Sequence, residues 1–137
     1  MNSIRSPKPA LAIQWTEEME SGIAEIDVQH RHLVALTNAV VIGHGLHSPA
    51  LVQSTLSELR AYVAEHFAAE ERWMQSLGYA TFAEHAREHH KISDYVEDLW
   101  ACRATLAAEN LFEILADWIY HHVAQESAEL RLISMCN

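Results

Sequence analysis

Histidine and glutamate side chains recur four residues apart in three separate parts of this 137-residue chain. The pairs are His66 and Glu70 in HFAAE, His85 and His89 in HAREH, and His122 and Glu126 in HVAQE. In an α-helix, positions four apart lie one above the other on the same face. Each segment, if helical, therefore presents two potential ligands in one direction. Only helices that face one another could bring three such pairs together.

Helical periodicity and helix-end signals divide the chain into four segments. The expected helices cover about 27–42, 49–77, 82–107 and 111–133. Ser48 and Pro49 read as a cap followed by a proline at the first helical position, and Gly78 as a left-handed residue that closes the second helix. The apolar positions assigned to one stripe of the first helix are Val28, Leu33, Leu36 and Val40.

The remaining signals predict an all-α fold. Thr81-Phe-Ala-Glu84 and Asn110-Leu-Phe-Glu113 both have the capping-box pattern, and no alternating β-branched runs compete. Four amphipathic helices with short connections predict an antiparallel up-down-up-down four-helix bundle. We expect a single domain over 1–137, in which 1–22 form an N-terminal arm, loose to about Ala12 and anchored by Trp15 and Ile23.

Composition excludes several classes of partner. The formal charge of −10 is opposite to the basic surface that nucleic acid or an anionic membrane requires. No segment approaches the roughly 20 apolar residues of a membrane span, and no signal peptide is evident, so we expect a cytoplasmic protein without a membrane partner. Cys102 and Cys136 are far apart, which favours neither a zinc knuckle nor a disulfide framework.

Together the candidate ligands favour a pair of metal ions in the bundle interior, where facing helices converge. His30, in IDVQH, adds a candidate on the first helix, so every expected helix carries one. Five imidazoles and two carboxylates exceed the needs of one tetrahedral zinc and suit two octahedral ions, of which iron is the first choice. The predicted ligands are His30, His66, Glu70, His85, His89, His122 and Glu126.

A simpler interpretation competes at each position. One such pair on its own would more often face solvent, and His66 with Glu70 would then be an ordinary helical contact. Recurrence on all four helices is what favours metal binding. The other five histidines lack the spacing or the expected face, and we expect them to be solvated: His32, His44, His47, His90 and His121.

Four longer stretches carry a resemblance to a known family. They are GIAEIDVQHRHLVAL (22–36), HFAAEERWM (66–74), GYATFAEHAREHHKI (78–92) and DWIYHHV (117–123). With these stretches the chain resembles a bacterial hemerythrin from Trp15 to about Leu130. The resemblance implies a four-helix bundle that holds a non-haem centre of two iron ions (Fe2+/Fe3+), joined by an oxo or hydroxo bridge.

The resemblance also implies a role for each ligand. His85, His89 and His122 would hold one iron, and His30 and His66 the other, which keeps a position open for dioxygen. Glu70 would bridge the two ions. The apolar side chains that fall where the family lines its site, and that would equally serve as plain bundle core, are Leu33, Phe67, Ile92, Trp118 and Val123.

One position departs from the hemerythrin pattern. Hemerythrins usually place a bridging aspartate five residues after the last histidine, where this chain has Ser127. Glu126 instead gives the His-x3-Glu spacing of HHE-type cation-binding domains, and we hypothesise that it bridges. Helix geometry places Glu126 about 40° and Ser127 about 140° around the axis from His122. Alternatively, Glu126 faces solvent and the site lacks its second bridge.

The resemblance implies a protein that binds dioxygen reversibly, for storage, delivery or sensing. The chain has no Gly-rich phosphate loop, nucleophile elbow or evident Cys-His pair, so we expect an oxygen-binding protein more than an enzyme. The alternatives are a di-iron enzyme acting on peroxide or nitric oxide, an iron delivery or repair protein of the HHE type, and a bundle that has lost its metal. The sequence leaves the oligomeric state open.

Overall fold

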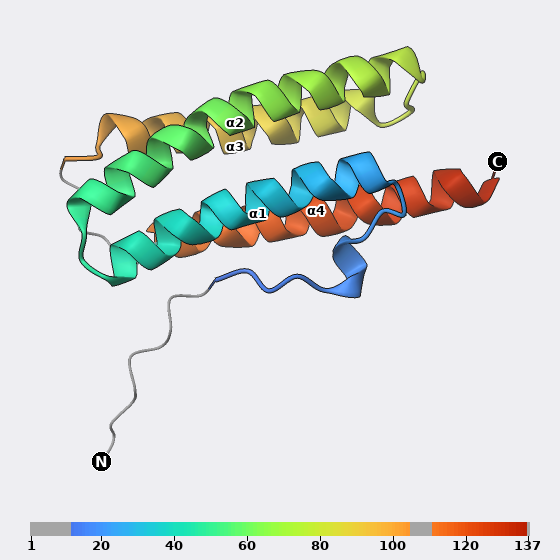
Figure 1. Ribbon diagram of the computed structural model, residues 1–137. Helices are drawn as coiled ribbons and strands as arrows, with labels where there is room; N and C mark the ends of the chain where they lie inside the picture. The colour runs from blue at the N-terminus through green and yellow to red at the C-terminus, as the bar shows by residue number, and fades with distance from the viewer. Residues whose placement is uncertain (1–11, 105–110, 137) are drawn as a thin grey trace.

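The computed structural model describes residues 12–104 and 111–136, and this part of the chain is helical without strands. A short 3-10 helix, η1, precedes four α-helices. Their bounds are Glu17–Met19 for η1, Ala24–Gly45 for α1, Pro49–Ser76 for α2, Phe82–Ala101 for α3 and Leu111–Cys136 for α4. In Figure 1, α2 and α3 form one layer and α1 and α4 the other, with consecutive helices antiparallel. The predicted all-α four-helix bundle is confirmed.

Helix ends follow the expected signals in two places. The Ser48 hydroxyl accepts the Leu51 N–H at 3.2 Å, ahead of Pro49 at the start of α2. Gly78, just beyond α2, has a φ of 64°, the left-handed conformation predicted for it. Both signals therefore bound α2 as the sequence indicated.

Other boundaries differ from the prediction. α1 begins three residues earlier and continues to Gly45. α3 ends at Ala101, well before residue 107, and the Arg103 N–H beyond it bonds to the Trp100 carbonyl, three residues back, as the chain turns. Thr81 is the N-cap of α3, but its side chain makes no capping hydrogen bond, so the predicted capping box is wrong there. The predicted cap at Asn110 lies outside the described residues.

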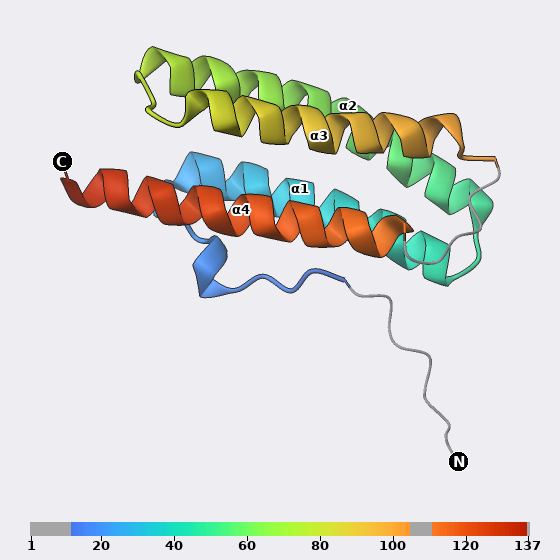
Figure 2. The same cartoon turned by 180° about the vertical axis from the view of Figure 1, so that it is seen from behind.

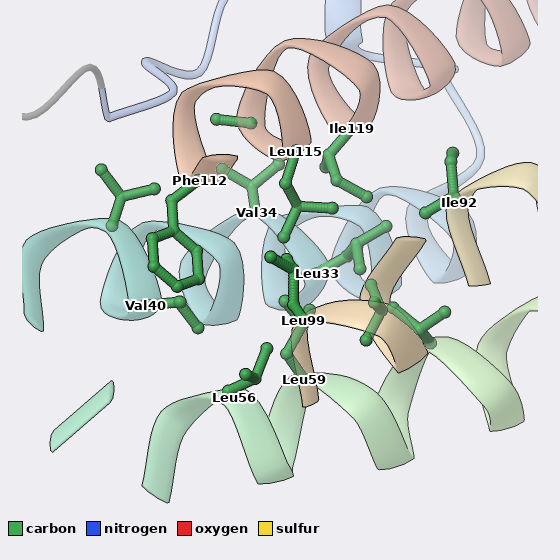
Figure 3. Close-up of a cluster of buried hydrophobic side chains, with 14 of the residues drawn as sticks. Leu33, Val34, Val40, Leu56, Leu59, Ile92, Leu99, Phe112, Leu115 and Ile119 are labelled. Atoms are coloured by element: carbon green, nitrogen blue, oxygen red, sulfur yellow. The ribbon is translucent and has the colours of Figure 1, made fainter. Parts of the chain in front are cut away.

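Apolar side chains from all four helices fill the interior between the layers. Figure 3 shows this cluster, which includes Leu33, Val34 and Val40 of α1, Leu56 and Leu59 of α2, Ile92 and Leu99 of α3, and Phe112, Leu115 and Ile119 of α4. Val28 does not join it and is 64% exposed. Five residues separate Val28 from Leu33, which turns it about 140° away from the buried stripe. None of the described helices combines the length and apolarity that a membrane crossing requires.

Residues 12–23, before α1, lie against the α1–α4 layer on the side away from α2 and α3 (Figures 1 and 2). Met19 is its fully buried anchor, whereas the predicted anchors Trp15 and Ile23 are half-buried. The Ser127 hydroxyl of α4 donates to the Met19 carbonyl at 2.8 Å. The Asn38 side chain of α1 exchanges two hydrogen bonds with the backbone of Ile13.

Candidate metal centre

All seven predicted ligands are buried. α1 supplies His30, α2 supplies His66 and Glu70, α3 supplies His85 and His89, and α4 supplies His122 and Glu126; none of them is more than 7% exposed. The early turns of α1 and α3 and the late turns of α2 contribute, because antiparallel packing brings these turns to the same level of the bundle. The polar cluster therefore lies toward the α2–α3 turn, beyond the apolar core.

Glu70 is the centre of this cluster, and its two oxygens face different imidazoles. Oε2 lies 3.0 Å from Nε2 of His30 and 3.0 Å from Nε2 of His66. Oε1 lies 3.1 Å from Nε2 of His89 and 3.6 Å from Nε2 of His122. One carboxylate thus separates the imidazoles into two sets.

Glu126 repeats this division from the opposite helix. Its Oε1 lies 3.0 Å from Nε2 of His30, and its Oε2 lies 3.5 Å from Nε2 of His122. Glu126 is fully buried, so the alternative in which it faces solvent is wrong. His30, Glu70, His122 and Glu126 each offer a ligand atom within 4.8 Å of the others. Ser127 is buried as well, but its hydroxyl bonds to the Met19 backbone.

Of the six contacts given above, only His30 Nε2 with Glu70 Oε2 has the geometry of a hydrogen bond, and the others fit metal ligation better. The buried atoms without a hydrogen-bond partner include Nε2 of His66, His89 and His122, Oε1 of Glu70 and both carboxylate oxygens of Glu126. Most buried polar atoms in proteins do have such a partner. Small divalent ions bind nitrogen and oxygen at about 2.1 Å, which puts neighbouring ligands of an octahedral ion about 3.0 Å apart. Four of the six separations given above, at 3.0–3.1 Å, match this value, and the two to His122 are longer, at 3.5 and 3.6 Å. The donor set of imidazole and carboxylate suits iron.

His66 and His89 each form a hydrogen bond through Nδ1, which leaves Nε2 free to bind a metal. Nδ1 of His89 lies 2.8 Å from a Glu71 oxygen, and Nδ1 of His66 lies 2.9 Å from the Gln29 side-chain oxygen. A histidine that donates through Nδ1 keeps its Nε2 lone pair for a metal, and the acceptor orients the ring. Tyr62 stacks on His66 and donates to the Gln29 carbonyl. Sequence spacing gave no sign of Gln29 or Glu71.

The cluster has strongly perturbed protonation without a metal. Burial opposes the charge of His30, yet the adjacent carboxylates of Glu126 and Glu70 raise its pKa to about 10. Burial also opposes the charge of Glu70, but its contacts with the Glu126 carboxyl and the imidazoles of His122, His30 and His66 hold its pKa well below the usual range. Burial and the charge of Glu70 raise the pKa of Glu126. A cation binding here must therefore displace protons.

His85 lies at the edge of the cluster. Its Nε2 is 2.7 Å from Oε2 of Glu129, and among the described residues this is the carboxylate it contacts, in place of Glu70 or Glu126. A cavity of about 70 Å³ adjoins both side chains. Glu129 did not belong to the predicted ligand set.

Of the five apolar side chains predicted to line the site, Phe67 has ring contacts with His66, His89 and His122. Leu33, Ile92 and Val123 are buried, and the Phe67 ring stacks on the His89 imidazole with a centroid distance of 3.9 Å. Trp118 is only half-buried, because it packs beside Tyr95 near the surface.

Four of the remaining histidines are exposed as expected, namely His32, His47, His90 and His121. His44 differs, because it lies in the last turn of α1, half-buried against the Phe112 ring.

Comparison with known proteins gives one family. The model described as "Hemerythrin HHE cation binding domain" matches residues 21–131. The bacteriohemerythrin of Stenotrophomonas maltophilia is 27% identical over 113 residues, covering 80% of this chain and 72% of that protein. The bacteriohemerythrin of Clostridium acetobutylicum is 26% identical over 133 residues, covering 84% and 95%. The bacteriohemerythrin of Methylococcus capsulatus is 29% identical over 113 residues, covering 80% and 86%.

Proposed function

The chain belongs to the hemerythrin family, and from this premise we propose that it is a non-haem di-iron protein that binds dioxygen reversibly. The observation that carries the proposal is the division of both carboxylates between two sets of imidazoles. Glu70 and Glu126 each direct one oxygen to His30 and the other to His122 or its neighbour His89. A single ion would give no reason for this double division, whereas two bridged ions require it.

Each group has a distinct part in the proposal. His30 and His66 hold one iron, His89 and His122 with His85 hold the other, and Glu70 and Glu126 bridge them. A pair of ferrous ions supplies the electrons that reversible dioxygen binding needs. Two imidazoles would leave their iron with fewer protein ligands than three, and that side would be the one open to dioxygen.

The apolar surroundings favour holding dioxygen over consuming it. Leu33, Phe67, Ile92 and Val123 are buried, and beside the cluster they would limit the access of water and protons on their side. Water and protons promote irreversible oxidation, so an apolar lining suits storage, delivery or sensing.

The test begins with protein purified and loaded with Fe2+ in the absence of air. We expect two irons per chain and, on exposure to air, a visible charge-transfer band that persists and is reversed when oxygen is removed. One iron per chain would contradict the di-iron centre. Rapid bleaching with consumption of added peroxide would contradict oxygen carriage and favour an enzyme.

Metal binding is expected to weaken steeply as the pH falls. Because the pKa of His30 is about 10 in the folded, metal-free protein, its imidazole carries a proton that a metal must displace throughout the neutral range. Displacing one proton lowers the apparent affinity about tenfold for each unit of pH decrease below that pKa. Anaerobic titration with Co2+ at several values from about pH 7.5 to about pH 8.5 measures how the apparent affinity changes with pH. An affinity that is level over this interval would contradict it, since an ordinary histidine is already neutral there.

A further inference from the structure

An acidic pocket connects the surface with the buried cluster. Its lining residues are Glu84, His85, Glu88, His122, Gln125 and Glu129, around a cavity of about 70 Å³. Glu84 and Glu88 are exposed on α3, whereas His122 is 2% exposed. The pocket thus extends from solvent-facing carboxylates to an imidazole of the metal centre.

His85 and Glu129 stand in the middle of this pocket. Their Nε2 and Oε2 atoms are 2.7 Å apart, and the Glu129 side chain is 29% exposed while that of His85 is 7% exposed. Oε2 of Glu129 nevertheless has no hydrogen-bond partner. The two atoms are close without being aimed at one another, as are the ligand atoms of the centre itself. The pair can therefore hold a cation between surface and interior.

A second observation shows which ligand of the centre adjoins the pocket. Nε2 of His122 is buried, has no hydrogen-bond partner, and belongs to a side chain that lines both the pocket and the centre. A cation held by Glu129 and His85 would have this imidazole as its next nitrogen ligand.

We propose that the pocket is the uptake site for Fe2+, in which Glu129 and His85 capture the ion and pass it to His122. This inference rests on the proposed iron centre and adds to it a transient site that shares His85 with the centre and has Glu129 as its own carboxylate. Glu84 and Glu88 raise the local concentration of cations at the mouth of the pocket, an effect that depends on salt. Glu129 binds iron during loading and holds none once the centre is filled.

The test measures the rate of Fe2+ loading in the Glu129→Gln variant. Metal-free protein is mixed with Fe2+ without air, and a chelator removes unbound iron at successive times. We expect loading to slow by about tenfold or more at low salt, while added salt narrows the gap to wild type. The final iron content and the visible spectrum in air are expected to equal those of wild type. Glu129→Asp should load at an intermediate rate.

Glu113→Gln is the matched control, because Glu113 is also on α4 but lies outside the pocket. Equal loading rates for Glu129→Gln and Glu113→Gln would overturn the uptake site while the iron centre stands. A lower final iron content or a changed spectrum in Glu129→Gln would also overturn the transient uptake site, because Glu129 would then be a permanent iron ligand. Failure of wild type itself to hold iron would instead contradict the proposed function.

Discussion

The Glu70→Gln variant is expected to lose both metal ions, with an affinity for Fe2+ at least about a hundredfold below that of wild type. Glutamine keeps the size of the side chain but removes its charge and replaces one acceptor oxygen with a donor. Because the Glu70 oxygens lie 3.0 to 3.6 Å from four imidazoles, the loss affects both sets of ligands together. Iron content after anaerobic loading and dialysis measures the effect.

Glu65→Gln is the matched control for this prediction. Glu65 lies on the same helix and faces solvent, so its replacement should leave the iron content unchanged. If Glu70→Gln kept one iron per chain, Glu70 would be a ligand to a single ion and not a bridge. If it kept both, the cluster would not be the metal centre.

The metal-free Glu70→Gln protein should also be less stable than metal-free wild type near neutral pH. The pKa of Glu70 is lowered in the folded state, so its charge stabilises the fold above the unfolded pKa, near 4.5. That contribution is lost as the pH falls through the folded pKa, and the two proteins should then converge. Urea unfolding at several pH values measures the difference.

The fold could be predicted because its signals are local. Repeated four-residue spacing, Ser48 with Pro49, and Gly78 each depend on neighbouring residues, and the helical bundle follows from them. The convergence of His30, His66, Glu70, His89 and His122 followed from one further step, namely that facing helices share an interior.

Features that depend on distant contacts could not be predicted. Met19 is buried, and its carbonyl accepts a hydrogen bond from Ser127, more than a hundred residues away. Spacing placed His85 beside the other candidate ligands, but gave no sign that its imidazole contacts Glu129 of α4. The end of α3 at Ala101 could not be predicted for a different reason, because no glycine or proline stands there to mark it.

The roles of Glu126 and Ser127, which are neighbours on α4, could not be predicted from the sequence either. Spacing alone left open which of them faces the centre, since the helical offsets were estimated for an ideal, isolated helix. In the structure both are buried, and they point to different partners: Glu126 to His30 and His122, Ser127 to the Met19 backbone. The packing of η1 against α4 gives Ser127 a structural role. Glu126, the residue before Ser127, is the one that presents a carboxylate to the imidazoles.

Because Glu126 and Ser127 have different partners, substitutions at these two positions should affect different properties of the protein. Glu126→Gln should lower the affinity for iron by about a hundredfold, because a buried charged ligand to both imidazole sets is lost. Ser127→Ala should leave the iron content and visible spectrum unchanged, but lower the free energy of unfolding by about 1–3 kcal/mol, because the buried Met19 carbonyl loses its donor. Iron analysis, visible spectra and urea unfolding, with and without metal, separate the two effects. Full iron content and an unchanged spectrum in Glu126→Gln would rule out Glu126 as a ligand, and loss of iron in Ser127→Ala would return the bridge to that position.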